Sequence, residues 1–500
     1  MKIIKSWVMS KCRLMIEMLF ENACEGRAVF SFPDVCQQLG FRAQLLDSSR
    51  TASGASIDTK TLMPGDLFVA LKGTRTDGHL FIEDAFQKGA SGALIDEKYF
   101  DKKHEYLLGR QDLFRNLLIV PNVQAAMIAL AAWYRARFNI PVIGVTGSIG
   151  KTTTKEFLHY LLSRRSRGIA NVGNLNNHLG VPLTLLRLGS EDAFCVAELG
   201  ANHPGEIKYL AEIIRPTAGL ITQIAAVHLE GFGSIDSVCE TKLELFGVLA
   251  PHSIAVLPEN DHKLFEKARR YELSFCRVGT TPYADYRLSN VKIEDGYVSF
   301  IMNEKYPFRF KSAASFLAMN ASMALAMAEK CGVKLEDIPA DWDDFKVPGG
   351  RFQEHRLAGG VRIINDAYNA SPHAFKNALK SFHELSVTGR KIVVFADMME
   401  LGEQTNYYHR ELGREIAKYP FDCVLGYGPL AEISLNTVYE VSTHAIIHKL
   451  KDAKETAKFL SEYLNEGDAV LLKGSHAMKV DDVLQSLRED PKWSDKNVAQ

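Results

Sequence analysis

The segment that most constrains this chain is residues 141–154, PVIGVTGSIGKTTT, where an apolar stretch runs into a glycine-spaced loop and then a helix-forming sequence. In a loop of this kind, Gly147 and Gly150 allow backbone N–H groups to turn inward towards anionic oxygens. Lys151 adds a compact positive charge, and the Thr152 hydroxyl can bind Mg²⁺. The segment therefore predicts a binding site for the phosphates of ATP or GTP.

The loop is a variant, because the strict Walker pattern expects glycine where this chain has Val145. We expect Ser148 and Thr153 to contact the nucleotide beside the residues already named. The next helix should bury one apolar face, at Phe157, Leu158, Leu161 and Leu162. A glycine turn that binds no ligand is the alternative.

The length, charge balance and cysteine count of the chain predict an ordinary globular protein with several hydrophobic cores. Its 500 residues are too many for one core, so two to four domains are expected. The 59 lysines and arginines nearly balance the 60 aspartates and glutamates, which argues against a protein that coats nucleic acid. The eight cysteines form no Cys-x-x-Cys pair, so neither a zinc cluster nor a disulfide scaffold is expected, and a reducing compartment fits best.

Residues 1–29 are expected to be an extension outside the main domains. Charged side chains interrupt their apolar positions, so they predict neither a signal peptide nor a membrane-spanning helix. A short amphipathic helix at residues 14–20 would either touch a membrane surface or pack as a frayed extension. We therefore expect a cytoplasmic protein without an integral membrane segment.

The rest of the chain predicts the α/β class, with a small α/β domain at residues 30–116, a central domain at 117–343 and a further α/β domain at 344–500. The central domain alternates strands with helices, which predicts a mainly parallel sheet covered on both faces. Strand-like pieces at 285–301 and a helix at 313–330 close it, and Ser371 with Pro372 predicts a helix start in the last domain. The expected strands are residues 67–71, 117–120, 141–146, 193–199, 218–224, 253–257, 361–365, 391–396, 423–425 and 469–472.

Polar residues follow several of these strands, where ligands of parallel sheets usually bind. Glu198 ends one strand and is our first choice for a Mg²⁺ ligand, because this ion prefers oxygen donors. His228 is a candidate for contacting metal or phosphate. The alternatives are a helix-capping or lysine-paired Glu198 and a histidine that is merely hydrogen-bonded. Lys242 lies in a helical pattern, where a surface lysine paired along the helix is the plain interpretation.

Two further groups are candidates for substrate contacts. Asn176 and Asn177 offer amides that both donate and accept, although they could equally stabilise a turn. In the last domain, the candidates suit a polyphosphate, a ribose or a substrate carboxylate, although any of them could be a salt-bridged surface residue. These are Arg351, Asp366, Tyr368, Asn369 and Lys473.

Four strings together resemble the Mur ligase family, the ATP-dependent enzymes that extend the peptide of bacterial cell-wall precursors. They are GNLNNHLGVPLT (173–184), ELGANHPGEI (198–207), HLEGFG (228–233) and DMMELG (397–402). The resemblance runs from about residue 30 onward and is most similar to the members that add D-alanyl-D-alanine. The Asp-Asn-Pro-Arg signature of the members that add diaminopimelate or lysine does not occur in the sequence.

The resemblance implies three domains: a small N-terminal α/β domain for the UDP end of the substrate, a central P-loop-type domain for ATP, and a C-terminal Rossmann-like domain for the incoming amino acid or dipeptide. It assigns Lys151 and Thr152 to phosphate and Mg²⁺, Glu198 and His228 to the metal site, and Asn320, Arg351 and Asp366 to ATP. Asp58, Thr59 and Lys60 resemble an Asp-Ser-Arg segment near the UDP site, with lysine in place of the arginine fork. Lys242 matches a lysine that carries a carbamate in several relatives.

The implied reaction activates the terminal carboxylate of UDP-N-acetylmuramoyl-tripeptide as an acyl phosphate, which the amine of D-alanyl-D-alanine then attacks. ATP and Mg²⁺ would be required, and a monomer is expected. Two alternatives stay open. One is another ligase of this family, acting on a different muramyl-peptide or adding glutamate to a folate. The other is a nucleotide-binding switch that condenses nothing.

Overall fold

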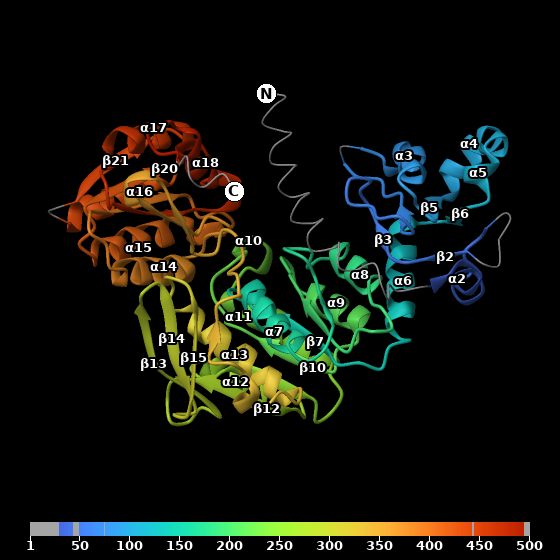
Figure 1. The fold of residues 1–500 in the computed structure, drawn as a ribbon, viewed down its shortest axis with the longest axis horizontal. Coiled ribbons are helices and arrows are strands. Elements are labelled where there is room, and N and C mark those ends of the chain that lie inside the picture. The colour runs from blue at the N-terminus through green and yellow to red at the C-terminus, as the bar shows by residue number, and fades with distance from the viewer. Residues whose placement is uncertain (1–29, 44–49, 75, 443–444, 495–500) are drawn as a thin grey trace. The chain divides into compact units, whose positions relative to one another are not determined.

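The computed structural model describes residues 30–43, 50–74, 76–442 and 445–494 (Figure 1). The expected extension at 1–29, including the helix at 14–20, lies outside these residues. The described chain forms two compact units. Among the described residues, the first unit comprises those up to 144, 162–199 and 208–218, and the second comprises 145–161, 200–207 and those from 219 onward.

The N-terminal part contains a four-stranded parallel sheet in the order β3-β4-β5-β6. Its strands and covering helices pack around a core that includes Phe68, Ile95 and Phe100. The expected strand at 67–71 ends at Val69, because the Leu71 N–H turns back to the Val69 carbonyl at 2.9 Å. The elements are β1 Phe30–Ser31, α2 Phe32–Leu39, β2 Thr51–Ala52, β3 Ala55–Ser56, β4 Leu67–Val69, α3 Ile82–Gln87, β5 Gly92–Asp96, α4 Glu97–Gly109, α5 Gln111–Phe114 and β6 Leu117–Val120.

The central part is built on a ten-stranded sheet in the order β16-β15-β14-β13-β12-β11-β10-β7-β9-β8. Strands β8 and β9, β11 to β13, and β15 and β16 pair in parallel, whereas β13, β14 and β15 form antiparallel hairpins. The strands are β7 Val142–Thr146, β8 Ile169–Ala170, β9 Cys195–Glu198, β10 Ala218–Ile221, β11 Ile254–Pro258, β12 Ser274–Gly279, β13 Tyr286–Glu294, β14 Tyr297–Met302, β15 Tyr306–Lys311 and β16 Asp341–Trp342. The apolar runs of the sequence thus mark strands whose residues are largely buried.

The helices of the central part agree with the sequence in the face that α7 buries and differ from it in where α13 begins. Helix α7 buries Phe157, Leu158, Leu161 and Leu162, as its sequence predicts. Helix α13 begins at Leu317, four residues after the expected start, because Ala314 N–H bonds the Ser312 hydroxyl in a turn. The helices are α6 Val123–Arg135, α7 Lys151–Ser163, α8 Gly180–Leu185, α9 Glu206–Ile214, α10 Leu229–Phe232, α11 Ile235–Val248, α12 His262–Ala268 and α13 Leu317–Lys330.

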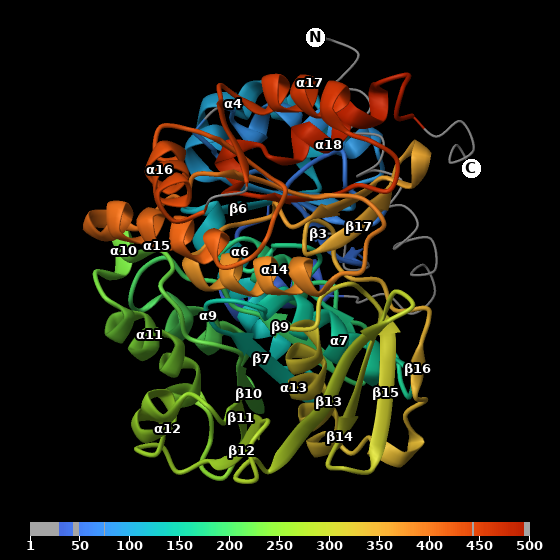
Figure 2. The same ribbon diagram turned by 90° about the vertical axis from the view of Figure 1, so that its left-hand side faces the viewer.

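The C-terminal part has a six-stranded sheet in the order β17-β18-β22-β19-β20-β21, parallel except for the pair β17 and β18. Helices α14 and α15 lie on one face, and α17 and α18 on the other (Figures 1 and 2). The helix start at Ser371 is confirmed, since its hydroxyl accepts the Ala374 N–H at 3.3 Å. The elements are β17 Gln353–Arg356, β18 Arg362–Asn365, α14 Pro372–Glu384, β19 Lys391–Ala396, α15 Thr405–Ala417, β20 Cys423–Tyr427, α16 Ala431–Val441, β21 Ile446–Leu450, α17 Ala453–Tyr463, β22 Ala469–Lys473 and α18 Asp481–Glu489.

The α/β class with a mainly parallel central sheet is therefore confirmed, whereas the residue bounds of the three domains stay a prediction. Within the part of the chain that the structure describes, no helix has the length and apolar composition needed to cross a bilayer.

Candidate functional site

The phosphate loop connects β7 to α7 and holds two glycines in backbone conformations that L-residues rarely adopt. Gly147 has φ of 142° and Gly150 has φ of 82°. A Cβ atom on Gly147 would lie 2.0 Å from the Thr222 hydroxyl oxygen, and one on Gly150 would lie 2.2 Å from the Asn320 amide nitrogen. Only glycine therefore fits at either position without displacing a neighbouring side chain.

The segment after β10 holds this loop in place. The Ser148 N–H donates to the Gln223 carbonyl at 2.7 Å, and the Ser148 hydroxyl both donates to the Ala225 carbonyl and accepts the Ala225 N–H, at 3.1 and 3.0 Å. The Thr222 hydroxyl donates to the Ile149 carbonyl at 2.6 Å. The hydroxyl of Ser148, expected to contact nucleotide, is thus engaged within the protein. Thr222 was not singled out from the sequence, although its hydroxyl directly follows an apolar strand.

The cationic and hydroxyl groups of the site converge at the start of α7. Lys151 Nζ donates to the Ser148 carbonyl at 3.1 Å, and Arg351 Nη2 donates to the Thr152 hydroxyl at 2.8 Å. The Arg351 guanidinium also stacks over the Tyr368 ring, 4.0 Å from its centroid. Two positive side chains therefore lie at the beginning of a helix, where a phosphate group would bind.

Two other nucleotide candidates differ in their surroundings. Asn320 Nδ2 donates to the Gly150 carbonyl at 3.0 Å and lies 3.1 Å from the Thr154 hydroxyl, so it supports the phosphate loop from α13. Thr153 is buried on α7.

Asp366 and Lys473 form a buried ion pair rather than two separate ligand contacts. Lys473 Nζ lies 2.6 Å from Asp366 Oδ2 and also donates to the Asn369 carbonyl at 3.2 Å. The other oxygen of Asp366 accepts the Phe352 N–H at 3.0 Å. Burial raises the pKa of Asp366, and the positive charge of Lys473 opposes this rise. The alternative of salt-bridged residues therefore describes this pair, although Lys473 is buried and Asp366 is only slightly exposed.

His228 has a left-handed backbone, with φ of 49°, immediately before α10. Its Nδ1 is hydrogen-bonded to the carboxylate of Glu400, and the Glu230 N–H donates to the Glu400 carbonyl at 3.3 Å. Burial lowers the pKa of His228, and the Glu400 charge acts in the opposite direction. Glu400 belongs to the DMMELG string and was not assigned a role from the sequence.

Lys242 lies in the interior, so the interpretation as a surface lysine is wrong. The residue is 1% exposed on α11, and its Nζ lies 3.5 Å from the Ala201 carbonyl and 5.1 Å from the centre of the Phe232 ring. Burial, together with the nearby charge of Lys151, lowers the pKa of Lys242 to about 7. A substantial fraction of this amine is therefore neutral near pH 7.

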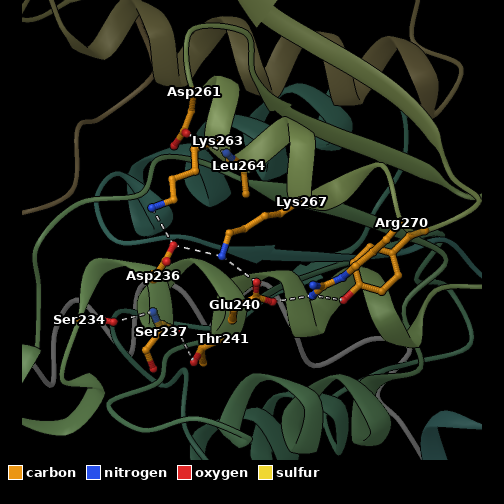
Figure 3. Close-up of polar contacts among 11 residues, drawn as sticks. Ser234, Asp236, Ser237, Glu240, Thr241, Asp261, Lys263, Leu264, Lys267 and Arg270 are labelled. Carbon is orange, nitrogen blue, oxygen red and sulfur yellow. Dashed lines mark hydrogen bonds and ion pairs between the residues drawn. The ribbon is translucent and has the colours of Figure 1, made fainter.

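The ion pairs of α11 lie instead on its outer side (Figure 3). Asp236 contacts Lys263 and Lys267, at 2.8 and 3.1 Å. Glu240 contacts Lys267 at 2.8 Å and Arg270 at 2.6 Å. Each exposed pair contributes little stability, but together they tie α11 to α12 and the turn after it. The helix that carries Lys242 is thus held from its solvent side.

Glu198 ends β9 and is 1% exposed. Its Oε1 accepts a hydrogen bond from Asn176 Nδ2 at 2.7 Å. Asn177 differs, because its side-chain oxygen accepts the N–H groups of Leu179 and Gly180, both at 3.0 Å, and so supports the turn into α8. Glu198 and the phosphate loop belong to different compact units. A metal site that they share with His228 stays a prediction.

The expected UDP-binding segment forms a turn in the first unit. The Asp58 carboxylate accepts the Lys60 N–H at 2.9 Å, and the Thr59 hydroxyl lies 3.5 Å from Lys88 Nζ. The Lys60 side chain is exposed. This geometry leaves a cation at the surface, and the contact with UDP stays a prediction.

The described residues contain no group of three or more histidine, cysteine, aspartate or glutamate side chains that could hold a metal ion. A Mg²⁺ ion bound to a nucleotide needs few protein ligands, because phosphate oxygens and water fill most of its positions. The hydroxyl of Thr152 and the buried carboxylate of Glu198 are each an oxygen donor of the type this ion prefers, so the chemistry of each side chain suits Mg²⁺.

Comparison with known proteins covers most of the chain. Three family models match: "Mur ligase family, catalytic domain" at residues 51–131, "Mur ligase middle domain" at 145–328 and "Mur ligase, glutamate ligase domain" at 350–476. The UDP-N-acetylmuramoyl-tripeptide–D-alanyl-D-alanine ligase of Bacillus subtilis is 32% identical over 88% of this chain and 93% of its own length. The enzyme of that name from Escherichia coli is 31% identical, over 89% and 96%.

Solved structures agree with this result. MurF ligase from Thermotoga maritima, in complex with ADP, superimposes with a TM-score of 0.73 at 29% identity, covering 87% of this chain and 97% of that one. MurF from Acinetobacter baumannii gives a TM-score of 0.79 at 27% identity, covering 93% and 100%. The prediction of a ligase with the three-domain fold is confirmed. The chain belongs to the Mur ligase family.

Proposed function

We propose that this chain is an ATP-dependent ligase that joins D-alanyl-D-alanine to UDP-N-acetylmuramoyl-tripeptide in peptidoglycan precursor synthesis. The observation that carries the proposal is the phosphate loop, whose glycines tolerate no side chain and whose far end brings Lys151, Thr152 and Arg351 together. The names of the relatives, which align over nearly their whole length, support the choice of substrates.

In the proposed reaction, the terminal carboxylate of the tripeptide attacks the γ-phosphorus of ATP and ADP leaves, which produces an acyl phosphate. The dipeptide amine then attacks the acyl carbon, and phosphate departs with the electron pair of the broken bond. Lys151 and Arg351 would offset the negative charge that develops on the transferred phosphoryl group. Asn320 would keep the loop backbone in position through its bond to the Gly150 carbonyl.

Bound Mg²⁺ would supply further charge neutralisation at the phosphates. We propose Thr152, Glu198 and His228 as the side chains that hold it, with His228 offering Nε2 because Nδ1 faces Glu400. Lys242 would act through its neutral form, which can take up CO₂ and release a proton to become a carbamate. Its low pKa supports this role, because a protonated amine cannot attack CO₂.

The substrate-binding roles are part of the same proposal. Asp58, Thr59 and Lys60 would bind the UDP end of the substrate, and Asn176 would lie near the metal through its contact with Glu198. Tyr368 would orient Arg351 by stacking beneath it. Asp366 would contact ATP, as the family resemblance implies, and its ion pair would hold Lys473 at the substrate.

The test is the dependence of ADP release on the amine. Purified protein receives ATP, Mg²⁺ and UDP-N-acetylmuramoyl-tripeptide, carrying either lysine or diaminopimelate at its third position, and then D-alanyl-D-alanine, an L-amino acid or glutamate. We expect ADP and ligated product only with D-alanyl-D-alanine, and neither product with Lys151→Ala. Release with another amine would favour a different ligase of the family, and slow release without any amine would favour a nucleotide switch.

We further propose that the protein acts as a monomer in the cytoplasm. The cysteines among the described residues are free thiols, which is consistent with a reducing compartment. Sedimentation of the purified chain at micromolar concentration would reveal a dimer if the monomer proposal is wrong.

A further inference from the structure

Strand β8 is only two residues long, but its pairing with β9 continues through a side chain. Ile169 lies opposite Cys195, and Ala170 lies opposite Val196, in parallel register. The next residue, Asn171, accepts the Glu198 N–H on its Oδ1 at 2.8 Å and donates from Nδ2 to the Glu198 carbonyl at 2.9 Å. Its carboxamide therefore meets the backbone of Glu198 as the peptide group of a longer β8 would.

The same carboxamide also fixes the loop that follows. Asn171 Nδ2 donates to the Leu175 carbonyl at 2.9 Å, which closes a turn of five residues. The next side chain, Asn176, reaches the Glu198 carboxylate at 2.7 Å. One buried side chain, 1% exposed, thus connects the backbone of Glu198 with the loop that carries Asn176, a hydrogen-bond donor to its carboxylate.

This arrangement bears on how a buried carboxylate is aimed. The Glu198 side chain extends from the last residue of β9, where regular pairing with β8 has already ended. Two fixed points, the backbone of Glu198 and the amide of Asn176, limit where its oxygens lie. The positions of the Glu198 backbone and of the Asn176 amide both depend on Asn171. Removing its carboxamide would leave the buried backbone groups that it bonds without that partner, which is costly.

We propose that Asn171 is a positioning residue for Glu198 and Asn176, and thereby for the metal ion of the phosphoryl-transfer step. The inference rests on the metal role given to Glu198 under the proposed function. Asn171 contacts neither metal nor substrate in this proposal. It acts as the outer-shell partners of metal ligands do, whose loss typically weakens metal affinity by about 10- to 100-fold.

The substitutions that separate this role from mere support of the fold are simple. Asn171→Ala removes the hydrogen bonds to the Glu198 backbone and to the Leu175 carbonyl, and Glu198→Ala removes the carboxylate that they orient. The double variant tests whether the two residues act through one another. Asn260→Ala makes the same chemical change at an exposed turn position and serves as the matched control.

The experiment measures Mn²⁺ binding to the full chain with ADP by electron paramagnetic resonance, alongside Tm and ligation rate. We expect Asn171→Ala to weaken Mn²⁺ affinity about 10-fold or more. The double variant should bind Mn²⁺ no more weakly than Glu198→Ala, and the control should match the unaltered protein. Should Asn171→Ala fail to fold, Asn171→Ser keeps one hydroxyl for the Glu198 backbone and allows the same comparison.

Three results would overturn the inference: unchanged Mn²⁺ affinity in Asn171→Ala, additive losses in the double variant, or unchanged affinity in Glu198→Ala. The last result would also remove Glu198 from the metal site. If the variants show the expected losses of Mn²⁺ affinity but the unaltered protein ligates no amine, the proposed function is refuted and the positioning role of Asn171 stands.

Discussion

Replacing the buried amine of Lys242 with an apolar side chain should stabilise this protein in a manner that depends on pH. The pKa of Lys242 falls from its ordinary value of 10.5 to about 7, chiefly because the amine is buried. A shift of this size corresponds to roughly 5 kcal/mol of penalty on the charged form, at about 1.4 kcal/mol per pKa unit. Lys242→Met keeps much of the side-chain volume and removes this penalty.

The direction of this pH dependence follows from proton binding in the folded and unfolded states. Between pH 7 and 10.5, the unfolded chain binds more protons at this residue than the folded chain, so the stability of the unaltered protein rises with pH across that window. Below pH 7 both states are protonated and the full penalty is present. We therefore expect the free energy of unfolding of Lys242→Met to exceed that of the unaltered protein by up to roughly 5 kcal/mol at pH 7, and this difference to shrink towards pH 10.

The assay is urea unfolding of both proteins at pH 7 and near pH 10, in buffers freed of CO₂ so that no carbamate forms. Lys102→Met, at an exposed position of α4, is the control and should change stability little at either pH. The reasoning would be refuted if Lys242→Met were no more stable than the unaltered protein at pH 7 and if the stability difference did not change between the two pH values. Added bicarbonate should stabilise the unaltered protein alone, and ligation should be lost in Lys242→Met.

Three further predictions concern the phosphate loop and its neighbours. Gly147→Ala should fold but lose ADP binding in calorimetry, because its Cβ would lie 2.0 Å from a threonine hydroxyl; unaltered affinity would contradict this. Arg351→Lys keeps the charge but loses the guanidinium fork at Thr152, so kcat/KM for ATP should fall about 10-fold with Tm unchanged, and equal turnover would argue against the contact. Gln223→Ala and His373→Ala each remove the same 2.9 Å hydrogen bond, so the double variant should lose no more Tm than either single one; additive losses would show that the residues act separately.

Much of the fold could be predicted from the sequence because the signals are local. Apolar runs of strand length mark buried parallel strands, and the serine and proline at 371 and 372 begin a helix wherever the chain places them. Strand β15 shows what was missed: its alternating Phe308 and Phe310 are buried and its polar neighbours exposed, a period-two signal that lies outside the expected strands. Order and direction within the sheet depend on pairings that no local pattern encodes.

The phosphate loop could be recognised from residue order alone, since its glycines, lysine and threonines lie within a few residues of one another and act through local backbone geometry. The burial of Lys242, the pairing of Asp366 with Lys473 and the contact of Asn171 with Glu198 depend on the folded arrangement of distant segments. These partners lie far apart in the chain, and burial, hydrogen bonding and charge depend on which segments the fold brings together.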